Sequence, residues 1–148
     1  ADLKPDILIF GKKSQISGIM VNEKFSEAIK SPYRKLESTF DGDLIDACRG
    51  KYIIKAIEKY SLLRKVRKNS EILNDELSQQ FLNYRSAGHL IAFDFLSEEK
   101  RDNFVLKAYE NNLLVNPTED KTVRLRPNLA FSLNEIDDLL SRIKKSNK

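Results

Sequence analysis

The sequence contains very little cysteine, histidine, methionine and tryptophan. One cysteine, Cys48, and one histidine, His89, stand among 148 residues, with one methionine and no tryptophan. A single cysteine excludes a disulfide within the chain and fits a reducing compartment, so a cytoplasmic location is predicted. One histidine and one cysteine offer no zinc site, and no metal is expected. We predict that His89 is a packed or edge residue of a strand and that Cys48 lies in the core on an apolar helix face.

Long apolar runs are also absent, which excludes several classes of protein. No run approaches the roughly 18 residues that span a bilayer, so no membrane partner is expected. The polar start, residues 1–6, lacks the apolar stretch of a secretory signal. Hydrophobic residues make up 41% and charged residues 32%, which fits a folded domain with its own core. No initiator methionine is present, so we expect the chain to be a piece of a longer protein.

The charge is only slightly unbalanced, with 26 Lys and Arg residues against 22 Asp and Glu residues. The densest basic clusters, residues 64–68 and 144–148, are expected at solvated helix ends, where cations complement the helix dipole. Nucleic acid is therefore not the expected partner. A small basic α/β module that binds polyanions without catalysis remains the alternative from another functional class.

Apolar periodicity predicts a mixture of strands and helices. Residues 7–10 form an apolar run stopped by Gly11, typical of a buried parallel strand. A second strand is expected over residues 16–21, where Gly18 indicates a bulge or close packing. The remaining predicted elements are helices over 44–63 and 70–82, a strand over 89–95, a helix capped by Ser97, strands over 113–115 and 122–125, and a helix opened by the capping box of Ser132 and Glu135 with the stripe Ile136, Leu139, Leu140 and Ile143.

The segment around Lys12 carries the sharpest chemical signal. Lys12 and Lys13 directly follow a strand and Gly11, at the position where α/β sheets hold their ligands. A desolvated lysine amine can condense with an aldehyde. The spacing alone also fits an exposed turn after a strand, and by itself it favours that interpretation.

Two further segments contain groups suited to anions. Ser38 and Thr39 precede the helix predicted from Leu44, and hydroxyls that open a helix suit a phosphate dianion, although they also make ordinary helix caps. Arg124 lies in a predicted strand shortly before Pro127. Its planar guanidinium suits a carboxylate, although an arginine in a strand is more often a surface residue.

These three segments, taken in order, resemble the class III aminotransferases. Residues 6–12 resemble the family's cofactor-lysine motif, and residues 11–18 are similar to the branch acting on the terminal amine of L-lysine, which has a double lysine. Residues 38–46 resemble the Ser-Thr-aromatic-Gly-Gly-Asn loop, and residues 123–129 resemble the Arg-x-x-Pro-Pro-Leu motif. The chain departs from these patterns at Glu37, Asp41, Asp43 and Asn128.

The resemblance implies an α/β fold of the fold-type-I pyridoxal-phosphate transferases. Residues 1–43 would form the end of the cofactor-binding large domain, and residues 44–148 the interdomain helix and the C-terminal α+β small domain. Lys12 would carry pyridoxal 5′-phosphate as a Schiff base and act in catalysis, with Lys13 as its neighbour. Ser38 and Thr39 would bind the cofactor phosphate, and because Thr39 reaches the cofactor of a partner subunit, a homodimer is implied.

The resemblance also implies the reaction. The enzyme would transfer the terminal amine of L-lysine to 2-oxoglutarate, with ornithine or 4-aminobutyrate as the nearest alternative donors. Arg124 would hold the α-carboxylate of glutamate or 2-oxoglutarate, and Arg126 would be a structural duplicate on the same strand face. The family's glycine-rich phosphate loop, stacking aromatic residue and pyridine-binding aspartate do not precede Lys12 here, so we expect the fragment alone to be inactive.

Overall fold

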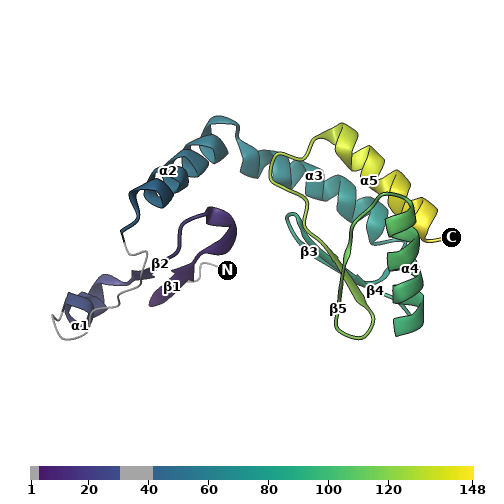
Figure 1. Cartoon of the computed structure of the whole chain (residues 1–148), viewed down its shortest axis with the longest axis horizontal. Helices are drawn as coiled ribbons and strands as arrows, with labels where there is room; N and C mark the ends of the chain where they lie inside the picture. The colour runs from purple at the N-terminus through teal and green to yellow at the C-terminus, as the bar shows by residue number, and fades with distance from the viewer. Residues whose placement is uncertain (1–3, 31–41) are drawn as a thin grey trace. The chain divides into compact units, whose positions relative to one another are not determined.

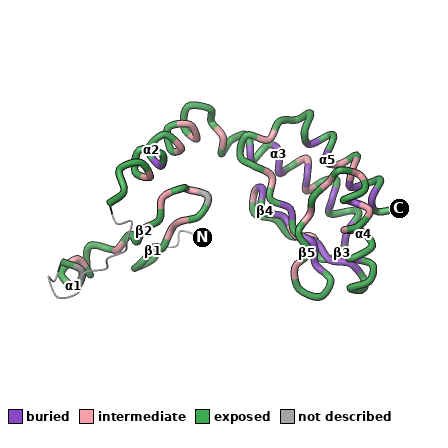
Figure 2. Tube along the Cα trace, viewed as in Figure 1, coloured by how far each residue is buried: buried purple, intermediate pink, exposed green. Residues whose placement is uncertain are grey.

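The computed structural model describes residues 4–30 and 42–148, apart from the side chains of Lys13, Ala28 and Ile29. The chain divides into two compact units, Ala1–Tyr60 and Ser61–Lys148 (Figure 1). Buried residues concentrate in the second unit (Figure 2). Among the described helices, none has the length and apolar character needed to cross a bilayer.

The first unit begins with a two-stranded hairpin. Strands β1 (Ile7–Phe10) and β2 (Gly18–Val21) pair in antiparallel register, with Ile7 opposite Val21 and Phe10 opposite Gly18. A Cβ atom added at Gly18 would lie 2.7 Å from the Phe10 ring. The predicted close packing at Gly18 is therefore confirmed.

The predicted direction and burial of β1 were wrong. β1 pairs with the next strand along the chain through a short connection, and such a connection joins antiparallel strands, whereas parallel strands need a long crossover. Within the described residues three of its four side chains are exposed, and Ile9 is 76% exposed. The apolar run correctly predicted a strand but did not reveal what would cover it.

The described residues of the first unit also contain four helical segments: the 3-10 turns η1 (Lys12–Ser14) and η2 (Glu23–Phe25), α1 (Ser26–Lys30) and α2 (Leu44–Lys59). α2 approaches the segment before β2 at Gly50, where an added Cβ would lie 2.8 Å from a methyl group of Ile16. Cys48 of α2 is exposed, so its predicted place in a core was wrong.

The break between α2 and the next helix lies earlier than predicted. Ser61 adopts a left-handed conformation (φ 49°), and α3 (Leu62–Leu77) begins directly after it. No glycine or proline marks this break in the sequence, so helical periodicity continued through it. The basic cluster at residues 64–68 lies in the first turns of α3 and not at a helix C-terminus, so the dipole explanation for it was wrong.

The second unit contains a four-stranded antiparallel sheet in the order β3-β4-β6-β5. Its strands are β3 (Leu82–Ala87), β4 (Leu90–Asp94), β5 (Asn116–Thr118) and β6 (Thr122–Leu125).

The strands predicted over 89–95 and 122–125 are confirmed as β4 and β6. β3 was not predicted, because the apolar residues near its start also continued the period of the preceding helix. The strand predicted over 113–115 was wrong, since β5 begins three residues later and contains Pro117. As an edge strand, β5 tolerates a residue that cannot donate a backbone hydrogen bond.

Two helix starts behave as the sequence predicts. The Ser97 hydroxyl accepts a hydrogen bond from the backbone N–H of Lys100 at the start of α4 (Glu98–Glu110). At the start of α5 (Leu133–Ser146), Ser132 and Glu135 form a reciprocal capping box. Both predicted caps are confirmed.

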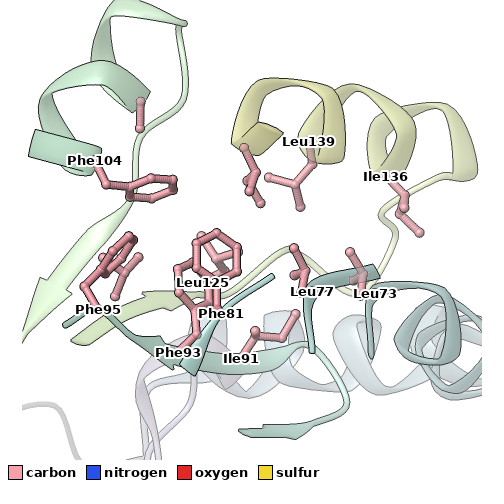
Figure 3. Packing of buried hydrophobic residues seen from close by; sticks show 13 residues of the cluster. Leu73, Leu77, Phe81, Ile91, Phe93, Phe95, Phe104, Leu125, Ile136 and Leu139 are labelled. Carbon is pink, nitrogen blue, oxygen red and sulfur yellow. The ribbon is translucent and has the colours of Figure 1, made fainter. Parts of the chain in front are cut away.

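One face of the sheet packs on helices α3, α4 and α5, and Figure 3 shows their side chains pointing toward one another. Phe81 stacks on Phe93 with 4.0 Å between ring centroids. The fully or nearly buried members of this core are Leu73, Leu77, Phe81, Ile91, Phe93, Phe95, Phe104, Ala108, Val123, Leu125, Ile136, Leu139 and Ile143.

Replacing Phe93, a fully buried residue, should strongly destabilise the second unit. We expect Phe93→Ala to lower the free energy of unfolding by about 3–5 kcal/mol, because it removes apolar contacts and leaves a cavity. Urea denaturation followed by circular dichroism measures this change. Leu96→Ala is the matched control, since Leu96 is 71% exposed, and its effect should stay within about 0.5 kcal/mol. Equal effects of the two substitutions would contradict the assigned core.

Candidate functional site

Lys12 lies at the end of β1, as the first residue of η1. Its backbone is left-handed (φ 62°), which is uncommon for a residue with a side chain. The backbone N–H of Gln15 donates to the Lys12 carbonyl at 3.0 Å, and the Ser14 hydroxyl donates to the Ile16 carbonyl at 2.6 Å. A tight, internally hydrogen-bonded turn therefore presents the exposed Lys12 side chain.

Gly11 lies close to Ser17 across this turn. A Cβ atom at Gly11 would lie 2.7 Å from the hydroxyl oxygen of Ser17, so a larger residue would require the Ser17 side chain to shift. The small residue before the lysine thus has a packing reason in this structure.

The predicted phosphate-binding residues Ser38 and Thr39 lie outside the described residues, as do Glu37 and Asp41. Asp43 is described, and it is the N-cap of α2. Its carboxylate accepts hydrogen bonds from the backbone N–H groups of Ile45 at 2.8 Å and Asp46 at 2.9 Å. The aspartate that departs from the family pattern therefore stabilises a helix start.

Arg124 lies in the middle of β6 with its side chain exposed. It is in register with Ala92 of β4 on one side and Asn116 of β5 on the other. Its neighbours Val123 and Leu125 are buried against the helices. Because side chains alternate along a strand, Arg124 must lie on the face of the sheet that the helices leave open.

Two other arginines share a hollow with Arg124. Arg85 is in register with Ala92 from β3, and Arg126 follows β6 two residues after Arg124. All three line an open hollow of about 420 Å³. Arg126 was predicted to share the strand face of Arg124; it lies one residue beyond β6 and lines the same hollow. Arg85 was not predicted as part of a site, because β3 itself was not predicted.

A polar network at Asp94 holds Arg85. The Asp94 carboxylate accepts hydrogen bonds from the Thr122 hydroxyl at 2.7 Å, the Asn83 amide at 3.0 Å and the Arg85 guanidinium at 3.1 Å. Burial raises the pKa of Asp94, but these three donors together outweigh burial and lower that pKa below its usual value. The carboxylate thus remains charged and orients one nitrogen of Arg85.

His89 lies in the two-residue connection between β3 and β4 and is buried. Its Nδ1 lies 3.0 Å from the carbonyl oxygen of Asn128, and its ring packs edge-on against Phe131. His89 is therefore packed, as predicted, although it lies in the turn before β4 and not in the strand itself. In the part of the chain that the structure describes, no three His, Cys, Asp or Glu side chains gather as metal ligands would.

Comparisons with known proteins assign the chain to a family. A family model for class III aminotransferases matches residues 1–146. The L-lysine-epsilon aminotransferase of Mycobacterium tuberculosis is 30% identical over 155 residues, which cover 98% of this chain and 34% of that protein. The 4-aminobutyrate aminotransferase of Emericella nidulans is 30% identical over 150 residues, covering 95% of this chain and 29% of that protein.

A solved structure supports the same assignment. The lysine aminotransferase of M. tuberculosis, in its internal aldimine form, superposes with a TM-score of 0.80 at 28% identity, over 98% of this chain and 36% of that one. The superposition confirms the type-I α/β fold implied by the motifs. The chain spans about a third of the length of the curated relatives it matches.

The Asp94 network predicts how stability depends on pH. Because the pKa of Asp94 is lowered on folding, its contribution is present above the unfolded pKa of about 3.9 and is lost as pH falls through the lower folded value. We expect Asp94→Asn to lower the free energy of unfolding near pH 7 by about 1.5–3 kcal/mol.

The difference between Asp94→Asn and the unchanged chain should shrink at pH values below about 4. Urea denaturation at a series of pH values measures it. Asp137→Asn, at an exposed position in α5, is the control and should follow the unchanged chain. A constant difference at every pH would count against the ionised network.

Proposed function

Because the chain belongs to the class III aminotransferases, we propose that it forms the C-terminal part of an enzyme that transfers the terminal amine of L-lysine to 2-oxoglutarate. The observation that carries this proposal is a lysine amine presented by a tight turn at a strand end, in a segment that resembles the family's cofactor-lysine motif. The match to L-lysine-epsilon aminotransferases over 98% of the chain supports the choice of donor.

The residues around Lys12 fit pyridoxal 5′-phosphate. The side chain is a primary amine, it is exposed, and it follows a small residue, Gly11, that packs closely against Ser17. When bound, the cofactor supplies an aldehyde for the amine and a ring that accepts electrons from the substrate. Lys12 would hold the cofactor through its amine and then move a proton at the substrate carbon, with Lys13 as a neighbouring cation.

The roles of Ser38, Thr39 and Arg124 belong to the same proposal. Ser38 and Thr39 would bind the cofactor phosphate, with Thr39 reaching the site of a second subunit, so the enzyme would be a homodimer. Arg124 would bind a substrate carboxylate, as its exposed guanidinium on the open sheet face allows. Residues 1–43 would complete the large domain and residues 44–148 would form the interdomain helix and small domain.

The chain spans about a third of its relatives, so we propose that the 148-residue chain is inactive alone and acts within a longer cytoplasmic enzyme. Ornithine and 4-aminobutyrate remain the alternative donors. The 4-aminobutyrate aminotransferase of E. nidulans is as similar in identity as the lysine enzyme, so overall similarity supports the reaction class more strongly than the donor.

The amine donor can be tested with the full-length enzyme that carries this chain. We expect the highest kcat/KM with L-lysine, and at least about tenfold lower values with ornithine and 4-aminobutyrate, a discrimination within reach of one or two pocket contacts. Formation of glutamate from 2-oxoglutarate measures each rate. A higher kcat/KM with either alternative donor would overturn the choice of L-lysine but not the reaction class.

The role of Lys12 can be tested in the same enzyme by reduction with borohydride followed by peptide mass spectrometry. We expect a single cofactor label, attached to Lys12 in the peptide that contains it. Lys12→Ala should abolish this label and the transaminase activity, because it removes the amine that is proposed to form the imine with the cofactor. Lys13→Ala is the matched control, and it should retain the label. Labelling of Lys13 in the unchanged enzyme would refute the assignment.

A further inference from the structure

The outer face of α3 carries a row of charged residues. The inner face of this helix is buried in the core of the second unit, whereas its outer face is exposed (Figure 2). Four of the exposed residues follow one another at spacings of four, three and four residues: Arg64, Lys68, Glu71 and Asp75. Successive residues of an α-helix lie about 100° apart, so these four form one stripe, about 60° wide, on the side opposite the core. We call it the α3 stripe.

The α3 stripe is basic in its first half and acidic in its second half. The first turn of α3 contains no acidic residue, the last turn contains no basic residue, and the N-cap Ser61 provides no side-chain hydrogen bond. This order of charges is the reverse of the one that stabilises an isolated helix, because the helix dipole is positive at the N-terminus and negative at the C-terminus. The charge pattern therefore has no explanation within the helix itself.

The rest of the chain does not use these charges either. Within residues 4–30 and 42–148, no salt bridge includes a side chain of α3. Helix α5 packs beside α3, but its ion pair, between Arg142 and Asp138, is internal to α5. Arg64 and Lys68 are like charges four residues apart on one helix, an arrangement that is unfavourable without a partner. The charges of the α3 stripe thus remain available to another molecule.

The α3 stripe is complementary to a reversed copy of itself. The four-residue spacing of Arg64 and Lys68 equals that of Glu71 and Asp75, and each corresponds to about 6 Å along the helix. When a second α3 lies antiparallel to the first, its Asp75 faces Arg64 and its Glu71 faces Lys68. A two-fold axis repeats both pairs, so one isologous contact contains four pairs of opposite charge. The second copy also brings carboxylates to the N-terminus of this helix, where the dipole favours them.

We propose that the α3 stripe is a docking surface for the α3 stripe of a second copy of this chain, in antiparallel orientation. A second copy fits better than nucleic acid, because the acidic half of the stripe would repel a polyanion while the basic half attracts it. This contact is separate from the homodimer proposed through Thr39, and it does not rest on the proposed function. Exposed ion pairs are individually weak and are screened by salt, so the contact forms at low ionic strength and weakens as salt is added.

Sedimentation equilibrium of the 148-residue chain tests this contact. Every sample carries Ile9→Lys, which places a charge on the exposed apolar hairpin and so prevents association through its strands. We expect a monomer–dimer equilibrium whose dissociation constant rises at least about tenfold between roughly 0.02 M and 0.5 M salt. A chain that stays monomeric at the lower salt concentration, or that associates independently of salt, would overturn the inference.

Charge reversal then identifies the surface. Arg64→Glu combined with Lys68→Glu makes the stripe acidic throughout, and Glu71→Lys combined with Asp75→Lys makes it basic throughout. Each double variant alone should dimerise at least about tenfold more weakly, because like charges then face one another. An equimolar mixture of the two restores four pairs of opposite charge. We therefore expect a heterodimer whose dissociation constant lies within about threefold of that of the chain with an unchanged stripe.

Lys65→Glu is the matched control. It makes the same charge change on the same helix, but at an exposed position about 100° around the helix from Arg64. It should change the dissociation constant by less than about twofold. Circular dichroism and the urea midpoint verify that each variant is folded, and folded double variants that fail to associate when mixed would refute the contact. Binding of a fluorescent oligonucleotide by the chain, without dimerisation, would replace the second copy by nucleic acid as the partner.

Discussion

The register between β4 and β6 is the constraint on which the second unit depends. Phe93 and Val123 are paired across these strands and both are fully buried against the helices. Because side chains alternate along a strand, the residues next to them in each strand must face away from the helices. Ala92 and Arg124, the next pair, consequently lie on the open face. A slip of one residue would bury Arg124 and expose Val123, at a large cost in free energy. The hydrophobic core therefore determines where the cation stands.

The same register brings polar residues together at one end of the sheet. Asp94 pairs with Thr122 across β4 and β6, and the Asp94 carboxylate reaches Asn83 and Arg85 of β3. At the other end, β3 turns into β4 through two residues, beginning with Gly88. Gly88 has φ 60°, and an added Cβ would lie 3.0 Å from a methyl group of Val66. β3 and β4 are thus tied to each other at both ends, and β6 is tied to them at the Asp94 end.

Features that depend only on neighbouring residues, such as helix caps, were predicted correctly from the sequence. The caps at Ser97 and Ser132 follow from hydroxyls placed before helix-forming residues, and the positions of Lys12 and Arg124 within their elements follow from short motifs and alternation. Burial could not be predicted in the same way. The apolar character of Ile9 and Cys48 says nothing about which segment covers them, and both are exposed in this chain. Arg85 was not predicted to lie in a strand, because no glycine or proline separates α3 from β3 and the predicted helix continued into β3.

The hairpin of the first unit has a practical consequence for work with the isolated chain. Ile7, Ile9 and Met20 are each more than half exposed, on two strands whose outer backbone groups have no further strand beside them among the described residues. Such an apolar ribbon is a template for pairing with another molecule. Self-association at high protein concentration would therefore begin at these two strands, and a charged substitution at Ile9 is the simplest way to keep the chain in solution.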